Sequence, residues 1–277
     1  MNVLELTSPE IQNLDRENAV VFFPIGTTEQ HGPHLPLGTK GFIAETLAFQ
    51  AGLQVKKQGR RCLVAPTLPY SCCQISFGAG PAFSIGARVF SDMVYEIGQS
   101  FYREGFRNFF VVNTSISPEN LKGISVALDD LNRLEGFRAY DPMPAWILSH
   151  KLLLDDYLKQ LGIVPENEVH ADVKETSALL YLDEEMVKKD LLCRLPPVQV
   201  NLSWETLKGH FTFRDMGADM GYIGSPGSAT PEIGKLYLEE GGEFLAECIQ
   251  AALAGDAIPG LPIPVRMFLT LIDLDES

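Results

Sequence analysis

Glu29 and His31 stand two residues apart, directly after the apolar run that ends at Gly26. A buried strand that stops at a glycine and is followed by a carboxylate and an imidazole is typical of α/β enzymes, whose sites lie beyond the carboxyl ends of strands. In an extended segment, residues i and i+2 face the same side. The pair therefore predicts a site for one or two divalent ions, and the turn residues around it, such as Gly32 and Pro33, favour a positioned loop.

A second pair of ionisable residues, His170 and Glu175, lies at the start of a predicted helix. His170 could act in acid–base chemistry or bind substrate. Alternatively, Glu175 with Thr176 and Ser177 supplies the polar groups that stabilise a helix N-terminus. Both interpretations stay open from the sequence. His34 is expected to stabilise its loop rather than to bind a metal.

The elements that must position these residues alternate along the chain. Short, continuous apolar runs indicate strands covered on both faces, and the segments between them have helical periodicity. This alternation predicts an α/β fold with a mostly parallel sheet and right-handed crossovers. The predicted strands are 20–24, 61–66, 108–113 and 137–141, and the predicted helices are 42–57, 89–104, 119–134, 145–161, 170–182 and 230–255.

The chain shows no internal repeat and no low-complexity linker, so we expect residues 1–277 to form one domain. The last helix begins with Thr230 as N-cap and Pro231 at its first position. Residues 259–277 are expected to form a C-terminal tail that docks on the body or on a neighbouring subunit.

Composition restricts the partners. The net charge of -14 argues against binding to nucleic-acid phosphates. No apolar run approaches the roughly 20 residues that a bilayer requires, and the first residues lack the pattern of a signal peptide. The five cysteines are an odd count without zinc-ribbon spacing, which favours reduced thiols and a cytoplasmic protein.

Residues 24–40 read PIGTTEQHGPHLPLGTK. This segment resembles the opening motif of the creatininase (creatinine amidohydrolase) family, PxGSxEQHGPHLPLxTD. Further segments match the family's motifs in the same order, from residue 20 to about residue 254. They are APTLPY at 65–70, REGFRNFFVVN at 103–113, HADVKETS at 170–177 and GYIGSP at 221–226.

The resemblance implies a three-layer α-β-α sandwich with a mostly parallel central sheet, commonly assembled as a hexamer. It also implies hydrolysis of C–N bonds in small cyclic amides or formamides, with two zinc or manganese ions. In the family, these ions are held by the Glu and His of the first motif, a bridging aspartate, a loop histidine and a further glutamate. On this pattern, Glu29 and His31 are the metal ligands, and His170 or Glu175 assists proton transfer.

Three positions depart from the family's ligand set. Lys40 replaces the bridging aspartate, Ser115 replaces the loop histidine, and Val173 stands where many members have the further glutamate. An ammonium repels a cation and cannot ligate one while it is protonated. We therefore expect one weakly bound zinc or manganese ion or none. Lys40 could pair with Glu29 instead, and the carboxylates that could rebuild the site are Glu119, Asp172, Asp215 and Asp219.

Three hypotheses for function follow. The first is a metal-dependent amidohydrolase of the family, acting on a carbonyl polarised by the metal and attacked by water. The second is a non-catalytic member whose metal-free pocket binds a small molecule or serves assembly. The third is a metal-free enzyme in which Lys40 is the base or the Schiff-base nucleophile, which needs its pKa lowered by burial.

Overall fold

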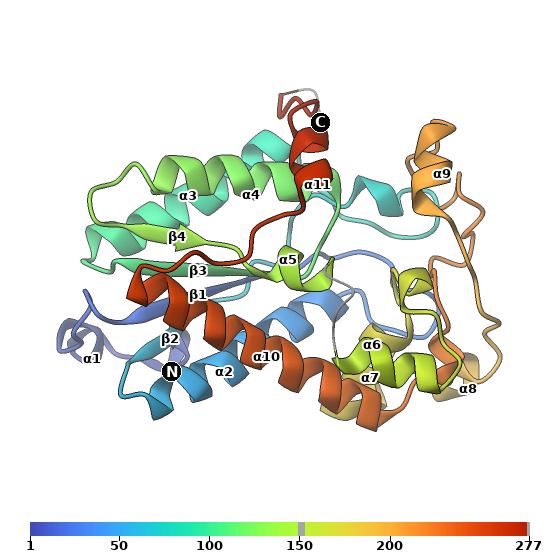
Figure 1. Cartoon of the computed structure of the whole chain (residues 1–277), viewed down its shortest axis with the longest axis horizontal. Helices are drawn as coiled ribbons and strands as arrows, with labels where there is room; N and C mark the ends of the chain where they lie inside the picture. The colour runs from blue at the N-terminus through green and yellow to red at the C-terminus, as the bar shows by residue number, and fades with distance from the viewer. Residues whose placement is uncertain (149–152, 276–277) are drawn as a thin grey trace.

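The computed structural model describes residues 1–148 and 153–275. Its sheet has the strand order β2-β1-β3-β4, and every neighbouring pair is parallel. Helices connect successive strands, so all four strands point their carboxyl ends to the same edge (Figure 1). The strands are β1 (Val20–Ile25), β2 (Cys62–Val64), β3 (Asn108–Asn113) and β4 (Arg138–Tyr140).

Helices cover both faces of this sheet. Val20 and Phe22 of β1 belong to an apolar cluster with α2 and α10, whereas Val21 and Phe23 belong to another with α3 and α4. Side chains alternate between the faces of a strand, so both faces of β1 are apolar because both are buried. The structure is thus the three-layer α-β-α arrangement expected, with all four strands parallel.

The helices follow the order of the chain. Helix α10 packs against α2 and α7, and α3 packs against α4. The helices are α1 (Ser8–Gln12), α2 (Thr39–Lys57), α3 (Ala87–Arg103), α4 (Pro118–Leu131), α5 (Met143–Ile147), α6 (Leu153–Gln160), α7 (Val173–Leu182), α8 (Lys189–Leu192), α9 (Leu202–Leu207), α10 (Pro231–Ala254) and α11 (Ile263–Leu269).

The predicted helices 42–57, 89–104, 119–134 and 230–255 differ from α2, α3, α4 and α10 by three residues or fewer at either end, and the other two differ as follows. The helix predicted over 170–182 begins at Val173, because Asp172 is its N-cap and accepts hydrogen bonds from the amides of Lys174 and Glu175. His170 therefore precedes the helix. The helix predicted over 145–161 appears as α5 and α6, and residues 149–152 between them lie outside the described part.

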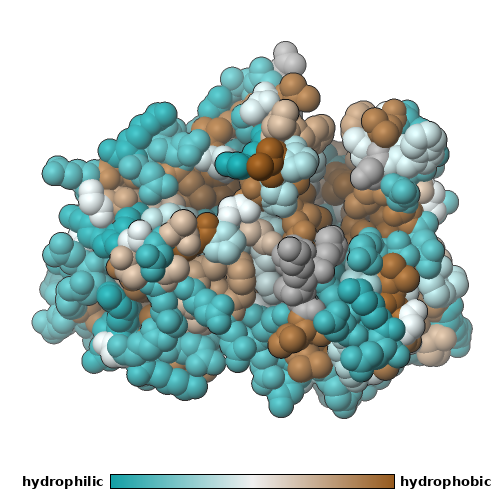
Figure 2. All heavy atoms as spheres, in the orientation of Figure 1, coloured by the Kyte–Doolittle hydropathy of each residue, from teal (hydrophilic) through white to brown (hydrophobic). Residues whose placement is uncertain are grey.

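Helices α9 and α11 are among the elements that expose apolar side chains. Figure 2 shows them over α9, where Trp204 and Leu207 are exposed, and on α11, where Ile263 and Met267 are exposed. Helix α11 packs on α4, and Arg88 forms a salt bridge of 2.8 Å with Asp275. Exposed apolar faces of this kind are typical of contacts with other proteins. None of the described helices is both long enough and apolar enough to span a bilayer.

Candidate active site

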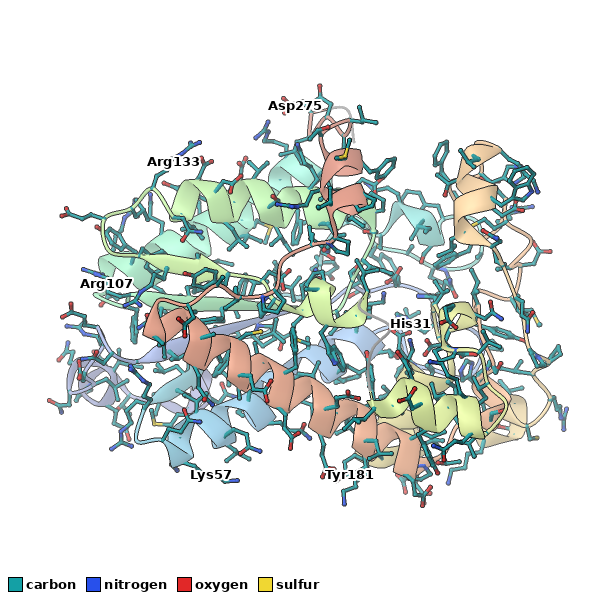
Figure 3. All side chains as sticks on the ribbon, in the orientation of Figure 1. His31, Lys57, Arg107, Arg133, Tyr181 and Asp275 are labelled. Atoms are coloured by element: carbon teal, nitrogen blue, oxygen red, sulfur yellow. The ribbon has the colours of Figure 1, made fainter. Side chains whose placement is uncertain are left out.

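The loop after β1 brings Glu29 and His31 to the carboxyl edge of the sheet, where Figure 3 labels His31. The end of β1 also lies very close to the start of α2. A Cβ on Gly26 would stand 2.5 Å from the Cα of Gly41, so only glycine permits this approach. The close contact carries Lys40, the residue before Gly41, to the site.

The Glu29 carboxylate is buried and fully engaged. Thr27 Oγ1 donates to Glu29 Oε1 at 2.6 Å, and Ser76 Oγ donates to Glu29 Oε2. Lys40 Nζ lies 3.8 Å from Glu29 Oε1. Burial opposes ionisation, but Lys40 and the Ser76 hydroxyl favour the anion, and the pKa of Glu29 is lowered to about 2. Glu29 is therefore an anion at neutral pH.

His31 and His170 each form a hydrogen bond from one ring nitrogen to a main-chain carbonyl oxygen. His31 Nδ1 lies 3.0 Å from the carbonyl oxygen of Glu29, and His170 Nε2 lies 2.9 Å from that of Gln30. These bonds require a proton on the nitrogen involved, so in the neutral rings the other nitrogen carries a free lone pair. His31 Nε2 is buried and has no hydrogen-bond partner among the described residues. Burial, with His31 close by, lowers the pKa of His170 to about 4, which keeps that ring neutral.

The position of His170 depends on contacts far along the chain. Its main chain exchanges hydrogen bonds with Ile223, at 3.1 Å and 2.9 Å. Ala171 has a φ of 46°, a left-handed conformation unusual for alanine, and its amide donates to Glu175 Oε2 at 2.7 Å. The rings of His31 and His170 lie 4.4 Å apart between centroids. This turn places the His170 ring beside His31 before α7 begins.

Lys40 is a buried cation among carboxylates. Burial would lower its pKa, but Glu175 and Glu29 act more strongly together, so the pKa of Lys40 is raised. This direction disfavours the neutral amine that a Lys40 base or Schiff-base nucleophile requires. A cation in the first turn of α2 also opposes the helix dipole, so helix stability does not explain it. The Lys40 ammonium lies at the site instead, where it pairs with Glu29 as the sequence suggested.

Glu175 lies on the other side of His31. Its Oε2 is 3.8 Å from His31 Nε2. Burial opposes ionisation of Glu175, whereas Lys40 and then His31 favour it, and its pKa is lowered. Two buried anions, Glu29 and Glu175, thus face the single ammonium of Lys40, so the centre has an excess of negative charge.

None of the carboxylates that could have rebuilt the site is grouped with Glu29, His31 and His170 among the described residues. Asp215 and Asp219 are exposed, and Glu119 is in the first turn of α4. Asp172 caps α7 through Oδ1. Burial together with neighbouring carboxylates raises the pKa of Asp172. Ser115 is buried and lines the site cavity, but a hydroxyl is a poorer ligand than an imidazole.

Two adjoining cavities open beside these groups. The first, of about 170 Å³, is lined by Glu29, Lys40, Ser115 and His170, with apolar walls from Ile75, Ile116, Leu202, Phe213 and Met216. The second, of about 120 Å³, is lined by Lys40 and Glu175 and continues over Glu168 and Asp172. They share Lys40, Ile116, Val169 and Leu202. A small molecule could occupy both.

The donor set fits one divalent ion. One potential ligand atom from each of Glu29, His31 and His170 lies within 4.8 Å of the other two, and all three residues are buried. Two imidazoles with a carboxylate are a usual set for a catalytic zinc ion. A carbonyl that accepts the second ring N–H is the usual support of a metal-binding histidine. A second ion fits poorly, because the Lys40 ammonium lies beside Glu29.

Sequence reasoning did not group His170 with the metal ligands, because 139 positions separate it from His31. It also missed Thr27 and Ser76 as partners of Glu29. Thr27 had a signal in its spacing of two residues from Glu29, whereas Ser76 had none. Glu168 was missed as well, although Glu168-Val169-His170 repeats the spacing of Glu29-Gln30-His31.

His34 supports the site without joining the possible metal group. Its Nε2 lies 2.8 Å from Thr176 Oγ1 of α7, which ties the first loop to that helix. Burial, with His31 nearby, lowers the pKa of His34 to about 4.

A His34→Gln variant should therefore gain stability relative to the wild type as the pH falls. The unfolded histidine binds a proton below about pH 6.5, but the folded one only near pH 4, so wild-type stability is lost in this window. We expect the difference in unfolding free energy to change by about 1.4 kcal/mol per pH unit between these limits. Urea titrations at several pH values measure it, and a difference independent of pH would contradict the shift.

Comparisons with known proteins bear on the fold and the family of this chain. The family model for creatinine amidohydrolase matches residues 4–249. A mycofactocin precursor peptide peptidase of Mycolicibacterium smegmatis is 28% identical over 226 residues, which is 80% of each chain. A crystal structure of creatinine amidohydrolase superposes with a TM-score of 0.71 at 22% identity, covering 91% of this chain and 97% of the other.

Three further creatininase structures are described with a metal or a bound ligand. One, described as the Zn–Zn type, has a TM-score of 0.69 at 22% identity, and the match covers 91% of this chain and 97% of the other. A manganese form has a TM-score of 0.67 at 24% identity, and the match covers 91% of this chain and 98% of the other. A third, in complex with creatine, has a TM-score of 0.70 at 23% identity over the same 91% of this chain and 98% of its own. From the match over residues 4–249, this chain belongs to the creatininase (creatinine amidohydrolase) family.

Proposed function

We propose that this protein hydrolyses a C–N bond of a small cyclic amide or a formamide, with one zinc or manganese ion held by Glu29, His31 and His170. The observation that carries the proposal is the orientation of the two imidazoles. Each has one ring nitrogen fixed by a main-chain carbonyl, and both lie with Glu29 in a buried group. His31 Nε2 has no hydrogen-bond partner among the described residues, and a bound metal ion would use its lone pair.

Lys40 would take the electrostatic place of a second ion. It lies 3.8 Å from Glu29, and its pKa is held up against burial by Glu175 and Glu29. One ammonium against two carboxylates leaves a net charge of about -1, which a single divalent cation reverses to about +1. A site of this charge favours the negative oxygen that develops when an amide carbonyl is attacked.

Residues of the chain would transfer the proton and bind the carbonyl oxygen. A divalent ion would polarise the carbonyl and make water a better nucleophile. Glu175, an anion that lines the second cavity, can accept a proton from the attacking water and return it to the departing nitrogen. Lys40 can donate a hydrogen bond to the carbonyl oxygen. In this assignment His170 orients the ion, and Glu175 carries the proton.

The activities for which related proteins are named support the reaction class. Creatinine amidohydrolase and mycofactocin precursor peptide peptidase both break the C–N bond of an amide. The apolar walls of the first cavity and its volume of about 170 Å³ suit a compact substrate.

Metal content tests the proposal. Protein purified without chelator and dialysed against zinc or manganese should hold about one ion per chain by elemental analysis. That form should hydrolyse cyclic amides or formamides, and chelation should abolish the activity. Two ions per chain would show that other residues complete a dinuclear site. A metal content near zero would contradict the proposed metal-dependent hydrolysis.

A non-catalytic binding protein is the second candidate. It is favoured by the state of Glu29, whose two oxygens already accept hydrogen bonds from Thr27 and Ser76 beside the Lys40 ammonium. In that case zinc should leave the melting temperature unchanged, and a small ligand should raise it in the presence of chelator.

A further inference from the structure

We propose that the second cavity binds a primary ammonium group of the substrate and that Glu168 is the carboxylate that receives it. This inference rests on the proposed function and names its substrate class: small amides that also carry a primary amine. The cavity lies next to the Glu29–His31–His170 group but includes none of those three residues. None of the roles assigned above uses Glu168.

Glu168 is a preorganised carboxylate with one oxygen to spare. The residue is only 5% exposed. Its Oε2 accepts hydrogen bonds from the amide of Val173 at 2.9 Å and from that of Ser225 at 3.0 Å. Its Oε1 is buried and has no hydrogen-bond partner in the described part of the chain. A buried carboxylate oxygen left unpaired is costly, so a donor from a bound molecule would satisfy it.

The orientation of Glu168 is fixed by the loop that follows residue 222. A Cβ on Gly224 would lie 2.5 Å from Glu168 Oε2, so only a glycine lets this loop approach the carboxylate. The amide of Ser225 then reaches Oε2, and the carboxylate cannot rotate without losing both backbone bonds. The free oxygen is thus held in one position before any ligand arrives.

The charges around the cavity favour a cation. Its lining includes the carboxyl groups of Glu166, Glu168, Asp172 and Glu175, the ammonium groups of Lys40 and Lys174, and the phenol of Tyr237. Both lysines are already paired: Lys174 Nζ lies 3.7 Å from Asp172 Oδ2, and Lys40 Nζ lies 3.8 Å from Glu29 Oε1. Among the described residues, no cation lies within 4.0 Å of the Glu168 carboxylate.

A primary ammonium fits these features better than a guanidinium does. A guanidinium binds best to two acceptors in one plane, whereas Glu168 offers a single free oxygen. An ammonium is compact and suits the smaller of the two cavities, which has a volume of about 120 Å³. Ile116 and Leu202 line both cavities, so a short apolar chain can link an ammonium at Glu168 to an amide at the metal group.

Calorimetric titration with two probes of equal length tests the subsite. At pH 7, n-butylammonium should bind the wild-type protein at least about tenfold more tightly than 1-butanol does. Glu168→Gln should remove most of this preference, because the amide has the same shape without the charge. Glu185→Gln, which changes an exposed carboxylate three residues beyond the end of α7, should retain it.

Zinc titration of the same proteins separates the two proposals. Glu168→Gln should bind zinc as the wild type does, because Glu168 is not in the metal group. Zinc binding without a preference for n-butylammonium would overturn the ammonium subsite alone. A preference without zinc binding would instead contradict the hydrolase. If Glu168→Gln does not fold, the wild-type comparison decides, and equal affinities for the two probes would refute the subsite.

Discussion

Replacing Lys40 by methionine is expected to destabilise the metal-free protein by about 3–5 kcal/mol, the usual cost of removing one partner from a buried ion pair. Methionine keeps most of the side-chain volume, so packing changes little. What is lost is the ammonium that Glu29 and Glu175 share. Glu29 then remains a buried anion supported only by the hydroxyls of Thr27 and Ser76.

Urea unfolding at pH 7 in the presence of chelator measures this loss. Lys57→Met is the matched control, because Lys57 lies on the same helix but is exposed, and it should change the unfolding free energy by less than about 0.5 kcal/mol. Excess zinc should stabilise Lys40→Met more than it stabilises the wild type, since the variant presents a more negative site. Equal stability of Lys40→Met and the wild type would show that Lys40 does not balance the buried carboxylates.

The central strands could be predicted because both of their faces are buried. The prediction of 108–113 coincides with β3, and that of 20–24 is one residue shorter than β1. The edge strands were predicted too long: 61–66 became Cys62–Val64, and 137–141 became Arg138–Tyr140. Each edge strand has one neighbouring strand in the sheet, so fewer of its apolar residues are paired.

The site could be predicted only as far as local spacing reaches. Glu29 and His31 lie two residues apart on one loop, and the replacement of an aspartate by Lys40 indicated the ion pair that the structure contains. The contribution of His170 depends on its main-chain pairing with Ile223 and on the left-handed turn at Ala171. Those contacts are tertiary, so no periodicity in the sequence could indicate them.

Replacing His31 by glutamine should lower the affinity for zinc at least about a hundredfold. Glutamine can still donate a hydrogen bond to the carbonyl of Glu29, so the loop keeps its support, but it lacks the imidazole lone pair that Nε2 offers. Loss of residues that merely support metal ligands weakens binding 10- to 100-fold, and loss of a ligand should cost at least as much. Competition with a chromophoric chelator measures the affinity.

His34→Gln is the matched control for this measurement, because it makes the same change at a buried histidine three residues further along the loop. His34 bonds to Thr176 and is not part of the possible metal group, so this variant should bind zinc within about threefold of the wild type. An equal loss in both variants would mean that the loop, and not the imidazole of His31, determines zinc affinity. A loss confined to His31→Gln would identify that imidazole as a ligand, because the two variants make the same change and differ only in which histidine is replaced.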